Sequence, residues 1–200
     1  MTDAVNQSQY QVRFDWGLPG LAAVGHGAHI VVWVDALPST AAAPEAATGA
    51  LPGTAPDAHG TAPDPVSVRG PAAIVTGSIG SAAAVAQWVL ERQAGLGDRA
   101  IVAVVAAGGE HGRFAVEDLL GAGAVIDALA AVGLDYCSPG AAAASAAYQG
   151  LRTAAGHMLT ACVAGKQLAA AEGREAVAAA RRASESPEFA LLRGFDESAG

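Results

Sequence analysis

The sequence predicts an α/β domain with a mainly parallel sheet, flanking helices in three layers and a helical C-terminal third. Short, continuously apolar runs such as HIVVWV (29–34) and AIVAVVAA (100–107) are typical of parallel strands that are buried on both faces. Strand-like and helix-like runs alternate between residues 72 and 132, and this alternation implies right-handed crossovers between parallel strands. We therefore expect residues 1–200 to form a single domain around a sheet of about five strands.

The expected strands are short. The first, 10–14, has a partly alternating pattern, and Pro19 and Gly20 predict a turn after it. The second, 29–34, is β-branched and aromatic. Apolar runs place the third and fourth strands at 72–76 and 100–107, and a last edge strand is expected at 189–192.

The expected helices follow from apolar residues at helical spacing. They cover 81–93, 116–132, 138–148, 151–168 and 174–183. Gly150 and Gly173 are expected to break the helical C-terminal third. Residues 41–71 differ from the rest, because they are rich in Ala, Pro, Gly, Thr and Asp and have little to bury. We expect this segment to be a Pro/Ala-rich loop or a disordered insert.

Composition and charge restrict the function. A net charge of −8 argues against nucleic acid or an anionic membrane as a partner, since both require a basic surface. The N-terminus has no signal-peptide pattern, and the longest dense apolar run, 28–34, is too short to span a bilayer. Cys137 and Cys162 are expected to be small buried residues in a reducing cytoplasm, with a disulfide as the alternative. The same composition is compatible with a homo-oligomer.

Carboxylates gather where the predicted strands end. Asp35, Glu110, Glu117 and Asp118 all follow predicted parallel strands, at the edge of the sheet where α/β proteins bind ligands. Oxygen ligands of this kind suit Mg²⁺, which binds through one or two carboxylates together with substrate phosphate and water. The alternative is structural, because Glu117 and Asp118 in a first helical turn would complement the helix dipole.

Other polar groups lie beside these carboxylates. Ser39 and Thr40 could contact a substrate through their hydroxyl groups, and Arg113 could hold an anion. The segment Gly77-Ser78-Ile79-Gly80 between a strand and a helix suggests a dinucleotide-binding loop, but it lacks G-x-G-x-x-G. A tight turn is therefore the preferred interpretation of that segment. His26 and His29 are interpreted as structural, while His111 and His157 are weak site candidates.

Four blocks of the chain resemble the 2-phosphosulfolactate phosphatases in their actinobacterial form. They are YQVRFDWG with VVWVDALPST, IVTGSIGSAAAVA, VAVVAAGGEHGRFAVEDLLGAGAVIDAL and SPGAAAASAAY. The resemblance implies an α/β fold, a magnesium ion and hydrolysis of a phosphate monoester of a small sulfonated hydroxyacid. Asp35, Glu110, Glu117 and Asp118 fall on the acidic positions of the family.

On this interpretation the site has three sets of residues. The catalytic residues are Asp35, Glu117 and Asp118, and the metal ligands are Asp35, Glu110 and Asp118. The substrate, a small anionic phosphorylated molecule, is expected to contact Ser39, Thr40, Gly108, Gly109 and Arg113. The alternative is a catalytically degenerate family member that binds a ligand or partner, since the chain carries no Asn-Gly pair and has Pro38 where the family usually has Arg or Ser.

Overall fold

The protein forms an α/β domain around one sheet. The computed structural model describes residues 6–37, 65–67, 72–109 and 113–195. Its strands are β1 (Val12–Trp16), β2 (Ile30–Val34), β3 (Ala73–Gly77), β4 (Val102–Ala106) and β5 (Leu191–Arg193). In these residues the sheet has five strands in the order β1-β4-β2-β3-β5. The first four are parallel, and β5 pairs antiparallel with β3 at the edge, which confirms the predicted sheet.

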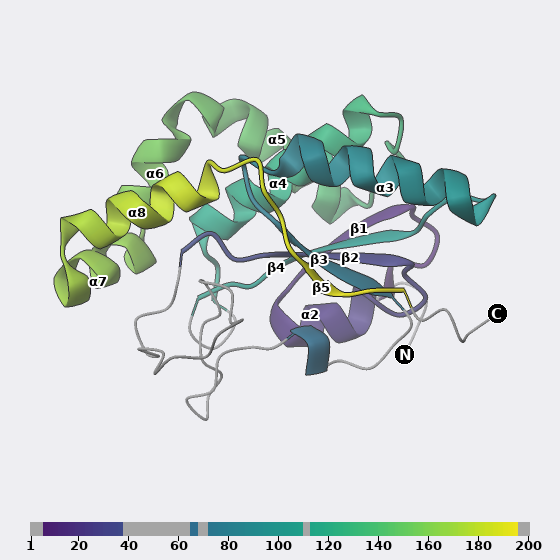
Figure 1. The fold of residues 1–200 in the computed structure, drawn as a ribbon, viewed down its shortest axis with the longest axis horizontal. Coiled ribbons are helices and arrows are strands. Elements are labelled where there is room, and N and C mark those ends of the chain that lie inside the picture. The colour runs from purple at the N-terminus through teal and green to yellow at the C-terminus, as the bar shows by residue number, and fades with distance from the viewer. Residues whose placement is uncertain (1–5, 38–64, 68–71, 110–112, 196–200) are drawn as a thin grey trace.

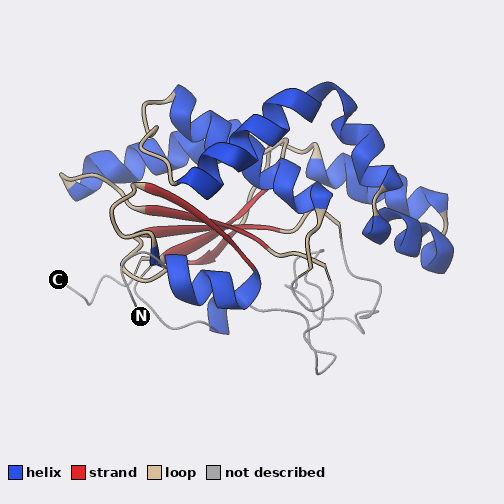
Figure 2. Ribbon diagram, turned by 180° about the vertical axis from the view of Figure 1, so that it is seen from behind, coloured by secondary structure: helices blue, strands red, loops and turns tan. Residues whose placement is uncertain are grey.

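Helices cover both faces of the sheet and form the predicted three layers (Figures 1 and 2). One face carries α2 (Gly17–Val24), and the other carries α3 (Ala82–Leu96), α4 (Val116–Ala131) and α5 (Pro139–Leu151). The last helices, α6 (Ala155–Ala161), α7 (Val163–Glu172) and α8 (Arg174–Ser184), gather at one end of the molecule. Single 3₁₀ turns lie at Pro65–Ser67 and Arg152–Ala154.

The central strands bury both of their faces, as their continuous apolar runs predict. Ile30, Val32 and Val34 of β2 pack into the core beneath α3, α4 and α5. Val31 and Trp33 point the other way, into the core beneath α2. This period of two follows from the pleat of a strand, so a strand between two helical layers has no polar face.

Small residues let α4 approach its neighbours closely. A Cβ atom added to Gly121 would lie 2.7 Å from Val34 Cγ1 on β2. A Cβ atom added to Gly123 would overlap the backbone oxygen of Ala144 and lie 2.8 Å from Tyr148 Cβ, both on α5. The glycines therefore allow the backbones to lie closer than larger side chains would permit, which fits a core with few aromatic residues.

The expected turn at Pro19 and Gly20 is wrong, because both residues lie inside α2. Proline is tolerated in the first turn of a helix, where its missing N–H would have no intrahelical acceptor. Gly20 is required by close packing, since an added Cβ would lie 2.8 Å from Asp15 Cβ. The Pro19-Gly20 pair therefore indicated a turn, although both residues are compatible with a helix at these positions.

Both predicted breaks in the C-terminal third are present. Gly173, with φ 90°, separates α7 from α8 as expected. Gly150 lies in the last turn of α5, which ends at Leu151, so that break falls one residue later than expected. The additional break falls at Cys162, whose extended backbone ends α6 and whose sulfur accepts a hydrogen bond of 3.2 Å from the Gly165 N–H to cap α7. Cysteine gave no sequence signal for this role, because it is rarely considered as a capping residue.

Three further expectations concern residues 41–71, the two cysteines and membrane-spanning helices. Most of the predicted 41–71 insert lies outside the described residues, which include only 65–67 of it. Both cysteines are free thiols. None of the described helices combines the length and the apolar composition needed to cross a lipid bilayer.

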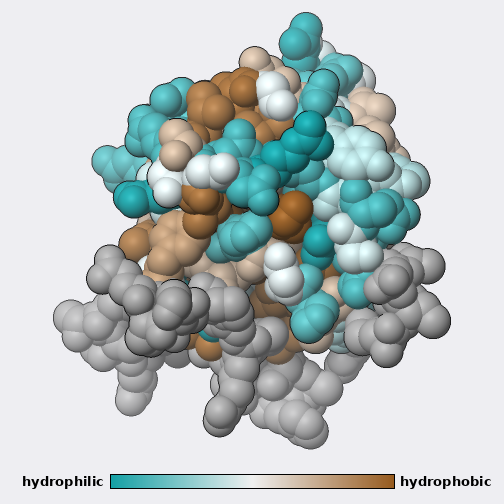
Figure 3. Space-filling view, turned by 90° about the vertical axis from the view of Figure 1, so that its right-hand side faces the viewer, coloured by the Kyte–Doolittle hydropathy of each residue, from teal (hydrophilic) through white to brown (hydrophobic). Residues whose placement is uncertain are grey.

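The face in Figure 3, at the end of the molecule away from α6, α7 and α8, is a mosaic of hydrophilic and hydrophobic residues.

Candidate functional site

The candidate site lies at the carboxyl edge of the parallel strands. β2 ends at Val34 and β4 at Ala106, and these two residues are register partners in adjacent strands. Asp35 and the segment 107–109 therefore leave the sheet side by side. In doubly wound folds this edge is the usual place for ligands, because the loops that follow the strands meet there. The helices α6, α7 and α8 lie at the same end of the molecule (Figure 1).

Asp118 links the ends of two strands to the start of α4. Its Oδ1 accepts a 2.8 Å hydrogen bond from the Ala36 N–H, and its Oδ2 accepts one of 2.8 Å from the Gly108 N–H. The side chain is buried, with 3% of its residue surface exposed. The structure thus places Asp118 at the same edge of the sheet as the residue that follows Asp35, which is the arrangement expected from the sequence.

Burial dominates the electrostatics of this carboxyl group. Desolvation raises the pKa of Asp118 to about 7, and the nearby charge of Glu117 adds to the increase. The N–H groups of Ala36 and Gly108 act in the opposite direction, because they stabilise the carboxylate. The side chain of Asp118 therefore changes its charge near neutral pH, far above the range of an exposed aspartate.

Glu117 is buried beside the Cys162 thiol. Burial raises the pKa of Cys162 to about 11, and the neighbouring Glu117 and Asp118 add to this increase. The Gly165 N–H has the opposite but smaller effect, because it stabilises the thiolate. The thiol stays protonated at neutral pH and donates a 3.1 Å hydrogen bond to the Leu159 carbonyl. Cys162 is consequently a capping and packing residue rather than a nucleophile.

The glycine-bearing loop after β4 is closed by its own backbone. Gly108 has φ 79°, which favours glycine, and donates its N–H to Asp118 as described above. The Gly109 N–H donates a 2.8 Å hydrogen bond to the Arg113 carbonyl, while the Arg113 side chain is exposed. Ser39, Thr40, Glu110 and His111 of the predicted set lie outside the described residues.

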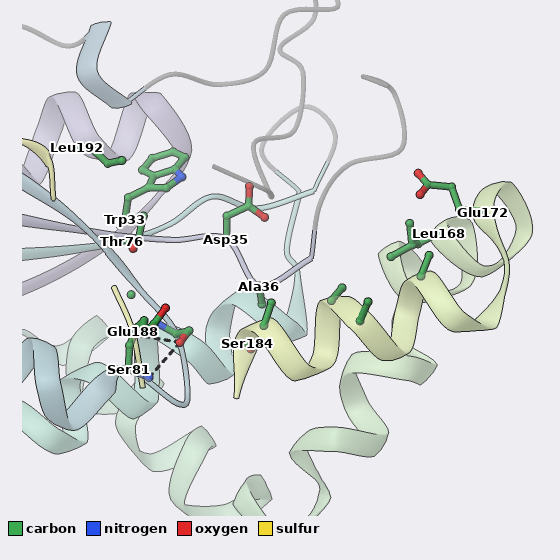
Figure 4. Close-up of a pocket in the computed structure, with 16 residues that line it drawn as sticks. Trp33, Asp35, Ala36, Thr76, Ser81, Leu168, Glu172, Ser184, Glu188 and Leu192 are labelled. Carbon is green, nitrogen blue, oxygen red and sulfur yellow. Dashed lines mark hydrogen bonds between the residues drawn. The ribbon is translucent and has the colours of Figure 1, made fainter. Parts of the chain in front are cut away.

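A cavity of about 500 Å³ opens beside Asp35 (Figure 4). Its walls come from the ends of β2 and β3, the β3–α3 turn, α7, α8 and the segment that leads into β5. The lining residues are Trp33, Asp35, Ala36, Thr76, Gly77, Ser78, Ser81, Leu168, Glu172, Ala176, Ala179, Ala180, Ala183, Ser184, Glu188 and Leu192. The charged side chains among them are all carboxylates. Asp35 is the member of the sequence-predicted site that lines this cavity.

Much of the cavity wall was not identified from the sequence. The one available signal was the spacing of Ala176, Ala179, Ala180 and Ala183, which places these alanines on one face of α8. Spacing alone does not distinguish a cavity wall from a helix interface.

Across the described part of the chain, no group of three or more His, Cys, Asp or Glu side chains is arranged to hold a metal. The predicted ligand Glu110 lies outside the described residues.

The β3–α3 turn is tight, as the sequence interpretation preferred. The Ser78 N–H donates to Ser81 Oγ at 2.9 Å, and the Ser81 N–H donates to Ser78 Oγ at 3.1 Å. The Gly80 N–H donates to the Ser184 carbonyl at 2.9 Å and fastens the end of α8 to the turn. Because these N–H groups are used within the protein, the turn does not offer them to a dinucleotide pyrophosphate.

Replacing Gly80 by Ala should destabilise the protein by about 1–3 kcal/mol. An added Cβ would overlap the backbone C and O atoms of Glu185, and backbone cannot move aside as a flexible side chain can. Chemical denaturation measures the effect. The matched control is Gly95→Ala in α3, where nothing lies within 4 Å of the added Cβ. That variant should be about 0.5–1 kcal/mol more stable than the wild type; equal effects at both positions would contradict the packing argument.

Comparison with known proteins assigns the chain to a family. The family model of the 2-phosphosulpholactate phosphatases matches residues 66–187, which include β3, the β3–α3 turn, β4, the Glu117–Asp118 pair and the helices α4 to α8. Asp35 precedes the matched segment. A search of curated proteins finds no match to the chain. Since the matched residues make up more than half of the sequence and agree with the fold, the chain belongs to the 2-phosphosulpholactate phosphatase family.

Proposed function

We propose that this protein is a magnesium-dependent phosphatase that hydrolyses a phosphate monoester of a small hydroxyacid, of the 2-phosphosulfolactate type. One observation carries the proposal beyond family membership. Asp35 follows β2 directly and lines a cavity of about 500 Å³, and the adjacent residue Ala36 is hydrogen-bonded to Asp118. A carboxylate that the family resemblance assigns to the site is therefore next to a space that can hold a substrate.

Magnesium fits the side chains at this edge chemically. Hard carboxylate oxygens are the protein ligands that Mg²⁺ prefers, and the charged residues of the cavity wall are carboxylates. Asp35, Glu110 and Asp118 are the proposed ligands. Each Asp118 oxygen accepts one backbone N–H and retains a further lone pair, so these hydrogen bonds do not exclude a metal. The bound ion would supply the positive charge that an acidic site needs to hold a phosphate and to stabilise its transfer.

The remaining proposed residues bind and position the substrate. Ser39 and Thr40 follow β2 closely in sequence, and Arg113 lies where α4 is about to begin. A guanidinium group can pair with two oxygens of a phosphate or sulfonate. Asp35, Glu117 and Asp118 are the proposed catalytic carboxylates, and the water that attacks phosphorus must transfer its proton to an acceptor of this kind.

The second candidate is a family member that binds a ligand or partner without hydrolysing it. The observation in its favour is that both oxygens of Asp118 already join secondary-structure elements, which is a structural role. The two candidates differ in whether phosphate is released.

Phosphate release from 2-phosphosulfolactate tests the proposal. We expect release that depends on enzyme concentration in millimolar Mg²⁺ and that disappears when EDTA removes the metal, because a site lined by carboxylates would otherwise repel the anion. A panel of other small phosphorylated acids, measured in the same way, defines the substrate range. Folded protein that releases no phosphate from any of these compounds, with or without Mg²⁺, would leave the second candidate in place.

A further inference from the structure

The cavity beside Asp35 has features that a small phosphorylated acid does not use. One wall is formed by four alanines of α8, and Leu168 of α7 and Leu192 of β5 line opposite ends of the cavity (Figure 4). The described part of the lining contains three carboxylates and no lysine, arginine or histidine. Two of the carboxylates, Glu172 and Glu188, belong to exposed residues and are thus solvated at the rim. Most of the wall therefore suits an uncharged group, and the carboxylates oppose an anion whose charge no bound metal offsets.

Within the described residues, two buried polar atoms of uncharged side chains at this cavity have no hydrogen-bond partner. They are Nε1 of Trp33 and Oγ of Ser184. Both residues line the cavity, with 2% and 5% of their surfaces exposed. The indole nitrogen of Trp33 lies on the side of its ring that faces Asp35 (Figure 4). Because an indole N–H only donates, its missing partner has to be an acceptor, and it is shielded from bulk water.

Hydrogen bonds hold the walls in place without ligand. The Gly80 N–H bonds to the Ser184 carbonyl, which fixes the end of α8. The Thr76 N–H donates to the Ala190 carbonyl at 2.9 Å, and the Ala190 N–H donates to Thr76 Oγ1 at 2.8 Å, which fixes the segment before β5. The cavity is therefore built by the fold, and a ligand does not have to order its walls.

We propose that this cavity binds an uncharged, mainly apolar molecule or group of about six carbons that carries a hydrogen-bond acceptor, such as a ketone. The acceptor would pair with Trp33 Nε1, and the hydrocarbon would contact the alanines of α8. This binding does not depend on phosphatase activity. The group could belong to a free neutral molecule or to the organic part of a phosphate ester, and the test below distinguishes the two sources.

Titration of the ¹⁵N-labelled full chain with 2-hexanone tests the binding directly. The chain has three tryptophans, so its spectrum contains three indole N–H signals, and Trp33→Phe identifies the signal of Trp33. We expect a saturable shift of that signal at millimolar ketone, with the signals of Trp16 and Trp88 unchanged. In Trp33→Phe, which lacks the donor, the ketone should bind about two- to tenfold more weakly by calorimetry.

A second pair of variants keeps the test decisive if Trp33→Phe does not fold. Ala183→Leu adds three carbons to the cavity wall at an exposed helical position and should weaken ketone binding at least tenfold. Ala170→Leu makes the same change at an exposed position of α7 that does not line the cavity, and it should leave binding within twofold. Absence of a saturable shift in the wild type, or equal binding by these two variants, would overturn the proposal.

Alkyl phosphates distinguish the source of the ligand. If the cavity holds the organic part of a substrate, kcat/KM should increase about fourfold for each added methylene from ethyl to hexyl phosphate. A constant kcat/KM, together with ketone binding, assigns the cavity to a separate neutral ligand. Ketone binding without phosphate release from any ester would reject the proposed phosphatase function and leave the binding site intact.

Discussion

Replacing Asp35 by Asn should reduce magnesium-dependent phosphate release about a thousandfold or more, if the proposed function is correct. The amide keeps the size of the side chain but lacks the negative charge that would hold Mg²⁺. The same variant should lose stabilisation by the metal. For the wild type this stabilisation is about 2.7 kcal/mol at a Mg²⁺ concentration of 100 times the dissociation constant, because only the native state gathers the ligands.

Thermal unfolding with and without Mg²⁺, alongside the phosphate assay, measures both effects. Without the metal the melting temperature of Asp35→Asn should be unchanged or raised, since the variant removes one charge from an acidic edge. Glu188→Gln is the matched control, because it removes a carboxylate from the rim of the same cavity that is not a proposed ligand. The control should keep its activity within about twofold. An Asp35→Asn protein with full activity would remove Asp35 from the catalytic set.

Replacing Asp118 by Ala should lower the free energy of unfolding by about 2–5 kcal/mol near pH 5. The change leaves the buried N–H groups of Ala36 and Gly108 without their acceptor and releases α4 from the ends of β2 and β4. Urea denaturation in magnesium-free buffer measures it. Asp127→Ala, on the same helix, removes a carboxylate whose hydrogen bond to Gln149 is exposed, and it should cost less than about 1 kcal/mol.

The stability of the wild type should also depend on pH through Asp118. Its pKa is about 7 in the native protein against 3.8 in the unfolded chain. At a pH between these two values, Asp118 is therefore protonated in the native state and ionised in the unfolded state. Unfolding then releases about one proton, and the free energy of unfolding falls by roughly 1 kcal/mol per pH unit as the pH rises between these two pKa values. The Asp118→Ala variant should lack this component, and its destabilisation should shrink toward pH 8. Identical slopes for the two proteins would contradict the assigned cause.

The sequence by itself determined the fold class. The apolar runs at 29–34 and 100–107 are β2 and β4, because residues buried on both faces of a parallel sheet must be apolar at every position. It also predicted that the residues after these strands meet at one edge, since parallel strands end on the same side. The Glu117–Asp118 pair lies there, in the first turn of α4 as expected. These features follow from local periodicity and the direction of the chain.

Only the tertiary structure decided the rest. It made α2 a helix despite Pro19 and Gly20, and it made Cys162 a cap. α2 packs against side chains of β3 and β4, which are distant in the sequence, and Cys162 caps through chemistry that is rarely used. The two backbone partners of Asp118 and the cavity between Trp33 and α8 are likewise products of packing. Local patterns record which residues are apolar, whereas a cavity or a buried hydrogen bond depends on the distance between elements. That distance is fixed only when the whole chain is folded.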